Sequence, residues 1–321
     1  MKNWWKNTFP QGQQKLTITD SQGYPVQIAY GEKGTGKPLF LLHGISSWSY
    51  NWRYLIQPLS KYFRVICFDA KGFGFSEKPL HRQETTGHQV IELQRVITAL
   101  CNEPVAIVAE SLGALTALAF AEEYPELVSG LVVINVPVFA EKLPHWGMSL
   151  LAQTPLELIE VIDQLRLSYL FAPLIRVIMA TERRSVLFDP SILTEEDVFW
   201  ITYPYIEFPG TFIKVAQELQ IAVREIDNYK NNKPNWLSKI QQNLINIRCP
   251  ILIMWGEQDS WFPLEHGKKL HQLLPNSQFK IINNCHHDAS TGAANAIKIA
   301  TIEFFGNSNS GVASDGDELS F

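Results

Sequence analysis

The chain has 321 residues, of which 46% are hydrophobic and 18% are charged, and its formal net charge is −5. This ordinary globular composition excludes a wholly disordered chain, a collagen-like fibre and a low-complexity protein. The slightly acidic balance also offers no basic surface for nucleic acid, so we expect no nucleic-acid partner.

The cysteine spacing and the length of the apolar runs bear on the cellular compartment of the protein. The four cysteines (Cys67, Cys101, Cys249 and Cys285) form no CxxC pair and no dense framework, which argues against a structural zinc site and against a disulfide scaffold. No apolar run reaches the roughly 18 residues that span a bilayer. The first ten residues lack the apolar centre of a signal peptide. We therefore expect a cytoplasmic protein with reduced thiols.

Two adjacent indoles lie near the start of the chain, where Trp4 and Trp5 stand between Lys2 and Lys6. Such a pattern is suited to weak contact with a membrane interface. The alternative is an N-terminal arm whose indoles pack on the body, and this alternative is favoured because single exposed aromatic residues are ordinary.

The rest of the first part, residues 1–136, alternates between strand and helix patterns, and the alternation resumes in residues 240–305. Predicted strands lie at 16–19, 26–30, 38–42, 65–68, 105–109, 131–136, 250–255 and 279–282, and predicted helices at 85–100 and 112–123. The first two strands read as an antiparallel hairpin. The later apolar runs are typical of buried parallel strands. The pattern predicts an α/β fold: a mostly parallel, doubly wound sheet of about eight strands with helices on both faces.

Residues 137–239 interrupt this alternation. They show helical periodicity and no convincing strand, so we predict an all-helical cap inserted between the two parts of the sheet. The apolar stretch 165–179 is also compatible with a helix on a membrane surface, although a cap helix packed on its neighbours is the more frequent case. The Gly/Ser/Asn/Asp-rich tail, 306–321, is predicted to be disordered.

Ser111 lies between a predicted strand and a predicted helix, in the sequence AESLG. A serine at such a sharp strand-to-helix turn has a strained backbone and an exposed hydroxyl, which favours a nucleophile. The positions two residues before and after it must be small, as Ala109 and Gly113 are. The alternative is a serine that only caps the helix.

Asp259 and the pair His286 and His287 each follow a later predicted strand. The carboxyl ends of parallel strands meet at one edge of a sheet, so we expect these side chains near Ser111. Serine, aspartate and histidine in this order would form a nucleophile, an acid and a base. The spacing from the strand fits either histidine as the base.

The first parallel strand ends at His43 and Gly44. Gly44 lets the chain turn so that the amide of Ile45 points toward Ser111. With the amide of Leu112, this would form an oxyanion hole, which is worth a few kcal/mol per donor. We interpret His43 as a structural hydrogen-bonding residue.

Together these features resemble the α/β-hydrolase family. The motifs that carry the resemblance are HG at 43–44, DAKGFGFS at 69–76, AESLG at 109–113, GEQD at 256–259 and His287. The resemblance covers about 16–136 and 240–305, and the insertion falls where the family has its cap. The sequence after the first motif is also similar to the haloalkane dehalogenase and epoxide hydrolase branch, but that branch uses an aspartate nucleophile.

The resemblance implies that Ser111 is the nucleophile, Asp259 the acid, His287 the base, and Ile45 and Leu112 the oxyanion donors. The chain departs from the family pattern at two positions: Ala109 replaces the usual first glycine of the elbow, and His286 replaces the usual glycine before the base.

We therefore expect a serine hydrolase that cleaves a carboxylic ester with an apolar acyl or alcohol group through an acyl-serine intermediate, without a metal or an organic cofactor. The cap would supply aromatic residues such as Trp146, Phe171, Trp200 and Phe212. The same triad would serve a C–C bond hydrolase or a perhydrolase. A ligand-binding protein that turns over slowly or not at all is the alternative from another class. The sequence does not determine the oligomeric state.

Overall fold

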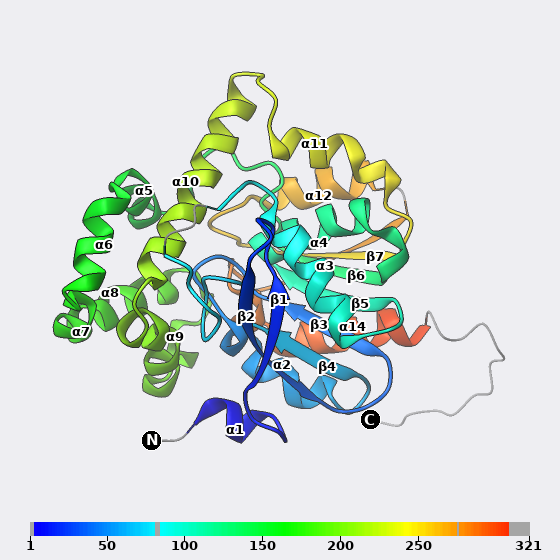
Figure 1. Cartoon of the computed structure of the whole chain (residues 1–321). Helices are drawn as coiled ribbons and strands as arrows, with labels where there is room; N and C mark the ends of the chain where they lie inside the picture. Colours follow the sequence, from blue (N-terminus) through cyan, green and yellow to red (C-terminus); the bar gives the residue numbers. More distant parts are fainter. Residues whose placement is uncertain (1–2, 81–83, 275, 308–321) are drawn as a thin grey trace.

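The computed structural model describes residues 3–80, 84–274 and 276–307 (Figure 1). Within this part of the chain, eight strands form one sheet in the order β1-β2-β4-β3-β5-β6-β7-β8. Their bounds are β1 Gln14–Thr19, β2 Pro25–Lys33, β3 Pro38–Leu42, β4 Arg64–Phe68, β5 Val105–Glu110, β6 Val128–Ile134, β7 Ile251–Gly256 and β8 Ser277–Ile282. Strand β2 pairs antiparallel with β1 and β4, and all other neighbours pair in parallel. The mostly parallel sheet and its opening hairpin are thus confirmed.

Helices cover both faces of this sheet, as expected for strands that are apolar throughout. In β3, Leu39 and Leu41 pack in the cluster that includes α2 and α14, whereas Phe40 and Leu42 pack in the cluster that includes α3 and α4. Successive side chains of a strand point to opposite faces, so one apolar run supplies both cores. The core helices are α2 Arg53–Leu59, α3 His88–Leu100, α4 Leu112–Glu123, α11 Trp236–Asn243, α12 Leu264–Leu273, α13 Ala289–Gly292 and α14 Ala294–Asn307.

The chain between β6 and α11 is helical in the part that the structure describes, and Figure 1 shows it in green at one side of the sheet. Its helices are α5 Trp146–Gln153, α6 Leu156–Gln164, α7 Leu167–Leu170, α8 Ala172–Ser185, α9 Glu195–Glu207 and α10 Thr211–Lys230. We call these six helices the cap. Helix α11 packs against α4, so it extends the layer on the sheet. The expected helix at 165–179 is divided into α7 and α8, with Arg166 in a left-handed conformation before α7.

The N-terminal helix α1 (Trp4–Thr8) packs on the body of the molecule. Trp4 and Trp5 are 8% and 1% exposed, and both rings contact Trp48. Both indoles are therefore buried in this fold, as the favoured alternative of an N-terminal arm packed on the body predicts, and little of either ring is left for contact with a membrane surface. Of the predicted disordered tail, Gly306 and Asn307 belong to α14, and residues 308–321 lie outside the described part.

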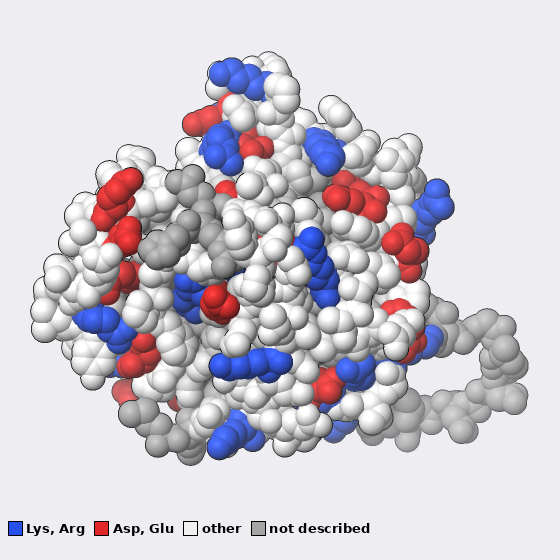
Figure 2. Space-filling view, in the orientation of Figure 1, with Lys and Arg blue, Asp and Glu red and all other residues white. Residues whose placement is uncertain are grey.

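Charged side chains are spread over the surface. Figure 2 shows basic and acidic groups interspersed over one face, without a large area of a single sign. Among the described residues, no helix combines the length and the apolar composition that a bilayer span requires.

Candidate active site

Ser111 lies at the turn from β5 into α4, and its backbone is strained. Its φ of 55° and ψ of −124° are rare for a residue with a side chain. The turn needs small neighbours, because a Cβ at Gly113 would lie 2.5 Å from the carbonyl oxygen of His43. The Ser111 side chain makes no capping hydrogen bond to the helix, so the capping alternative is wrong.

The Ser111 hydroxyl is hydrogen-bonded to a histidine, and that histidine to a carboxylate. The distance from Ser111 Oγ to His287 Nε2 is 3.0 Å, and His287 Nδ1 lies 2.9 Å from Asp259 Oδ2. The other oxygen of Asp259 accepts hydrogen bonds from the backbone N–H groups of Trp261 and Phe262. The three side chains expected from separate strand ends are thus brought together in hydrogen-bonding order.

The structure also distinguishes the two adjacent histidines. Successive residues leaving a strand point in opposite directions. The ring of His287 stacks on Trp261 with 4.5 Å between ring centroids. The ring of His286 contacts Phe188 edge-on, at 5.9 Å, and makes no hydrogen bond to Ser111 or Asp259 among the described contacts. Only His287 has the position of a base.

The electrostatic surroundings of His287 favour its protonated form. Burial alone lowers the pKa of the ring, because a buried charge is poorly solvated. The carboxylates of Asp259, Glu110 and Asp288 outweigh burial and raise the pKa of His287 above its ordinary value of 6.5. An imidazolium formed when the ring takes the Ser111 proton is therefore stabilised.

Asn135 is a supporting residue that the sequence analysis did not assign. Strand β6 ends at Ile134, earlier than expected, because Asn135 turns the chain with a φ of 50°. Its side-chain amide donates to the carbonyl oxygen of His287 at 2.8 Å, and its side-chain oxygen accepts from Gly256 N–H at 2.9 Å. Asn135 therefore ties the base-bearing loop to the end of β7. The available signal was an asparagine inside the apolar run predicted as the strand 131–136.

Glu110, the residue before Ser111, holds the same loop from the other side. Its carboxylate accepts from the N–H groups of Ala289 and Ser290, from the Ser290 hydroxyl and from the Asn51 amide, all at 2.7–3.0 Å. Burial and the neighbouring charge of Asp288 raise the pKa of Glu110. These four donors occupy both oxygens, so the role of Glu110 is to fix the loop that follows His287.

The residues expected to form the oxyanion hole lie beside Ser111. An ideal Cβ at Gly44 would be only 3.6 Å from Ser111 Oγ, and Ile45 follows it directly. Leu112 begins α4, where backbone N–H groups have no partner within the helix. His43 is structural, as expected: its Nδ1 donates to Gly44 O and its Nε2 accepts from Ala70 N–H. Burial lowers the pKa of His43 to about 4 and keeps it neutral.

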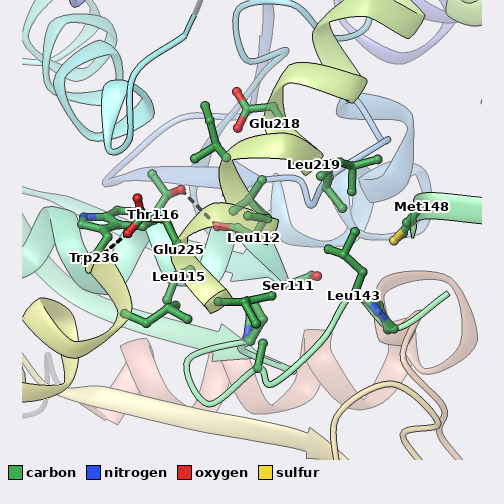
Figure 3. Close-up of a pocket in the computed structure, with 18 of the residues that line it drawn as sticks. Ser111, Leu112, Leu115, Thr116, Leu143, Met148, Glu218, Leu219, Glu225 and Trp236 are labelled. Atoms are coloured by element: carbon green, nitrogen blue, oxygen red, sulfur yellow. Dashed lines mark hydrogen bonds between the residues drawn. The ribbon is translucent and has the colours of Figure 1, made fainter. Parts of the chain in front are cut away.

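Two cavities meet at Ser111. The larger has a volume of about 650 Å³ and lies mostly under the cap, with His287, Asp288 and Arg183 in its wall. The smaller, of about 120 Å³, is shown in Figure 3 and lies between α4, α10 and α11. We call them the large and the small cavity. Ser111 and Ile45 line both.

Most of the large cavity is apolar. Three of the four aromatic residues expected from the cap line it: Trp146, Phe171 and Phe212. Trp200 is not part of its wall, because it packs with Trp48 and Tyr50; which of the four line the cavity was not determined by the sequence. The small cavity is lined by Leu112 and Leu115 of α4 and Leu219 of α10, and Glu225 and Trp236 lie at the end away from Met148 (Figure 3).

Among the residues that the structure describes, one group of side chains could hold a metal ion by geometry alone. Glu84, His88 and Glu92 bring one ligand atom each to within 4.8 Å of one another. However, Lys71 Nζ lies 2.7 Å from Glu84 and 2.5 Å from Glu92. The lysine ammonium already occupies the place of a cation, so the group is an ion-pair network.

Comparisons with known proteins agree with the fold. The model of the family described as "alpha/beta hydrolase fold" matches residues 37–291. The 2-hydroxy-6-oxononadienedioate/2-hydroxy-6-oxononatrienedioate hydrolase of Comamonas testosteroni is 25% identical over 91% of this chain and 96% of its own length. The 2-hydroxy-6-oxo-2,4-heptadienoate hydrolase of Pseudomonas putida is 28% identical over 79% and 83%, respectively. The crystal structure of a serine hydrolase involved in carbazole degradation superposes with a TM-score of 0.69 at 22% identity, covering 92% of this chain and 99% of that chain.

Proposed function

We propose, on the premise that this chain belongs to the alpha/beta hydrolase fold family, that it hydrolyses its substrate through an acyl group carried by Ser111. The observation that carries this proposal is the continuous hydrogen-bond chain from Ser111 Oγ to His287 and from His287 to Asp259. A serine hydroxyl becomes a nucleophile when a positioned base takes its proton, and the carboxylate holds the correct tautomer of that base.

The reaction has two halves. In the first, Ser111 Oγ attacks a carbonyl carbon, His287 takes the hydroxyl proton, and the leaving group departs with that proton and the electron pair of the broken bond. In the second, water attacks the acyl-serine, His287 takes a proton from water, and Ser111 regains its hydroxyl as the acid is released. The amides of Ile45 and Leu112 would stabilise the oxyanion in both halves.

The first candidate for the broken bond is a C–C bond beside a ketone. The relatives named above are hydrolases of 2-hydroxy-6-oxo-dienoates. The dienoate skeleton in these names carries no ester or amide group, so its hydrolysis at the 6-oxo carbon breaks a C–C bond. The match over most of both chains supports the same bond type here.

The second candidate is a carboxylic ester with an apolar acyl or alcohol group. The observation that favours it is the apolar character of the large cavity, whose wall includes Phe171, Leu174 and Ile178. These three side chains are at least 44% exposed. An apolar pocket with few polar groups selects an apolar substrate, and an ester uses the same acyl-serine.

Labelling with a fluorophosphonate, followed by mass spectrometry, tests the common step. We expect one adduct on Ser111 and none in the Ser111→Ala variant. His287→Ala and His286→Ala form a matched pair: the first should lower turnover by about 10⁴-fold or more, whereas the second should keep at least about a tenth of it. Labelling that persists in Ser111→Ala would overturn the proposal.

Two substrate series then separate the candidates. 2-Hydroxy-6-oxo-2,4-heptadienoate and its uncharged 1-carboxamide test C–C hydrolysis with and without a charge on the leaving fragment, and p-nitrophenyl esters of increasing chain length test ester hydrolysis. Turnover of the first series at a higher kcat/KM supports the C–C candidate, and the reverse supports the ester. A protein that is labelled at Ser111 but turns over neither series would be a ligand-binding protein on this fold.

A further inference from the structure

A charged pair joins the cap to the loop beside the base. Arg183, on α8 of the cap, places its Nε 2.8 Å from Asp288 Oδ2. Its Nη2 also donates to the side-chain oxygen of Asn51. Asp288 directly follows His287, and its side chain is 2% exposed. Both members of the pair line the large cavity.

The pair lies on the side of Ser111 that receives the leaving group, an assignment that rests on the proposed function. The leaving group must accept its proton from His287 Nε2. His287 lines the large cavity and is absent from the wall of the small one. The leaving group therefore occupies the large cavity near Arg183, and the acyl part extends along Leu112 and Leu115 into the small cavity.

The positive side chain in this region is already paired with a carboxylate, so it is not free to bind a negatively charged substrate group. Arg183 is the one lysine or arginine among the described residues that line the large cavity. Asp288 neutralises it, and Glu110, whose four donors are all from the protein, adds a second carboxylate nearby. A carboxylate on the leaving group would meet an arginine that is already paired and two acidic groups. Like charges at close range repel one another, so such a leaving group would be disfavoured.

We propose that Asp288 is a built-in counter-ion of Arg183 and that the pair makes the leaving-group side of the site select uncharged leaving groups. In the dienoates named for the relatives, hydrolysis at the 6-oxo carbon leaves the carboxylate on the leaving fragment. This chain would therefore share the bond-breaking chemistry but take a leaving group without that charge. Asp288 and Arg183 are specificity-determining residues in this proposal.

A matched pair of esters measures this selectivity directly. 3-(Butanoyloxy)benzamide and 3-(butanoyloxy)benzoate have the same acyl group and similar phenol leaving groups, and they differ only in the charge of the leaving group. For the unmodified protein we expect kcat/KM for the benzamide ester to exceed that for the benzoate ester by at least about tenfold, the change expected for 1.4 kcal/mol. Equal values for the two esters would overturn the proposal.

Two single variants should move this ratio in opposite directions. Asp288→Asn removes the charge but keeps an oxygen that can accept from Ser290 and Thr291, and it should lower the benzamide-to-benzoate ratio by about tenfold or more. Arg183→Gln leaves Asp288 unpaired and should raise the ratio. A variant that only damaged the structure would lower kcat/KM for both esters equally. It would not move the benzamide-to-benzoate ratio, and the two variants would not move it in opposite directions. The surface change Asp189→Asn, at an exposed position outside both cavities, is the control and should leave the ratio unchanged.

Protection from labelling provides a readout that does not need turnover. We expect 3-hydroxybenzamide to slow fluorophosphonate labelling of Ser111 at lower concentration than 3-hydroxybenzoate, and Asp288→Asn to remove this difference. If Ser111 is labelled but both ratios are the same in Asp288→Asn as in the unmodified protein, the selectivity proposal is wrong and the hydrolase proposal stands. Absence of labelling at Ser111 would instead contradict the proposed function.

Discussion

The sheet and the cap bury their apolar residues to very different degrees. In β3, β5 and β7, every residue is buried. Between 146 and 178 in the cap, by contrast, many large apolar side chains are exposed, including Trp146, Leu158, Leu165, Leu170 and Val177. Glu157 is the only charged residue among the exposed residues of that segment.

This difference separates two uses of apolar surface. In the sheet, burial provides the free energy of folding and fixes the strand ends, which hold Ser111, Asp259 and His287. In the cap, part of the apolar surface lines the large cavity and part is exposed elsewhere, so we expect it to contribute less to stability than the buried residues of the sheet. Substitutions that affect chemistry should therefore cluster at strand ends, and those that affect substrate choice should cluster in the cap.

The largest effect is expected at a strand end. Asp259→Asn should lower kcat by about 10⁴-fold, because the amide favours the wrong tautomer of His287. Glu257→Gln is the matched control, since that carboxylate contacts Gln258 at the surface and should change kcat little. Steady-state kinetics with the best ester checks both. If the two variants exchanged their effects, Asp259 would not be the acid.

The contact between the core helix α3 and the cap helix α10 contains buried charged groups, so the free energy of unfolding should depend on their charges. His88 of α3 lies 2.5 Å from Glu218 of α10. Burial lowers the pKa of His88, but Glu218 and Glu92 outweigh it and raise the pKa to about 10. His88→Leu leaves buried carboxylates without their partner, which should lower the free energy of unfolding by about 3–5 kcal/mol near pH 6.

The pH dependence of that stability loss follows from the raised pKa. The protonated ring stabilises the folded state fully below about pH 6.5, the ordinary pKa of histidine. This contribution is lost as the pH rises through about 10, the pKa of His88 in the folded protein. The difference in denaturation midpoint between His88→Leu and the unmodified protein should therefore shrink toward pH 10. A constant difference would indicate a packing effect.

Truncation of matching leucines compares the two regions directly. Leu118→Ala in α4 removes a fully buried side chain and should cost about 2–5 kcal/mol of unfolding free energy. Leu170→Ala in the cap removes one that is 68% exposed and should stay within about 0.5 kcal/mol. Urea denaturation measures both. Similar losses would show that the outer face of the cap is covered in the folded protein.

The acid limb of the pH–rate profile should move with the charge beside His287. His287 must be neutral to accept the serine proton, so kcat/KM should fall as the pH drops through its raised pKa. Asp288→Asn removes one of the carboxylates that raise this pKa, so the limb should move to lower pH. The limb should not move in Asp189→Asn, and an unchanged limb in Asp288→Asn would mean that Asp288 does not affect the base.

The smallest expected effect concerns the outer face of the cap. Weak contact between the cap and a membrane stays a prediction from the sequence, now through residues such as Leu170 and Val177 and not through Trp4 and Trp5. Flotation with neutral phosphatidylcholine vesicles tests it. The double variant Leu170→Ser/Val177→Ser should bind the vesicles more weakly than the unmodified protein, with a decrease of at most about tenfold. Leu273→Ser in α12 is the control, and equal binding by all forms would exclude the cap as the contact.

Much of the candidate site could be predicted because it depends on local patterns. The small residues around Ser111 and the position of Asp259 after an apolar run are each encoded within a few residues. The chain order of serine, aspartate and histidine then linked them through the edge of one sheet. The spacing alone did not separate His286 from His287, because a shift of one residue reverses the direction of a side chain while leaving the sequence pattern unchanged. The family resemblance favoured His287, and the structure shows its ring between Ser111 and Asp259.

The sequence alone determined the alternation of apolar strands and helices, and with it the sheet and the residues at its strand ends, because burial of strands and helices imposes short-range periodicity. Only the tertiary structure decided that Asn135 and Glu110 hold the base-bearing loop and that Arg183 of the cap pairs with Asp288. It also decided that Trp4 and Trp5 are buried. These contacts join residues far apart in the chain, and their geometry depends on how complete elements pack, which no local pattern records.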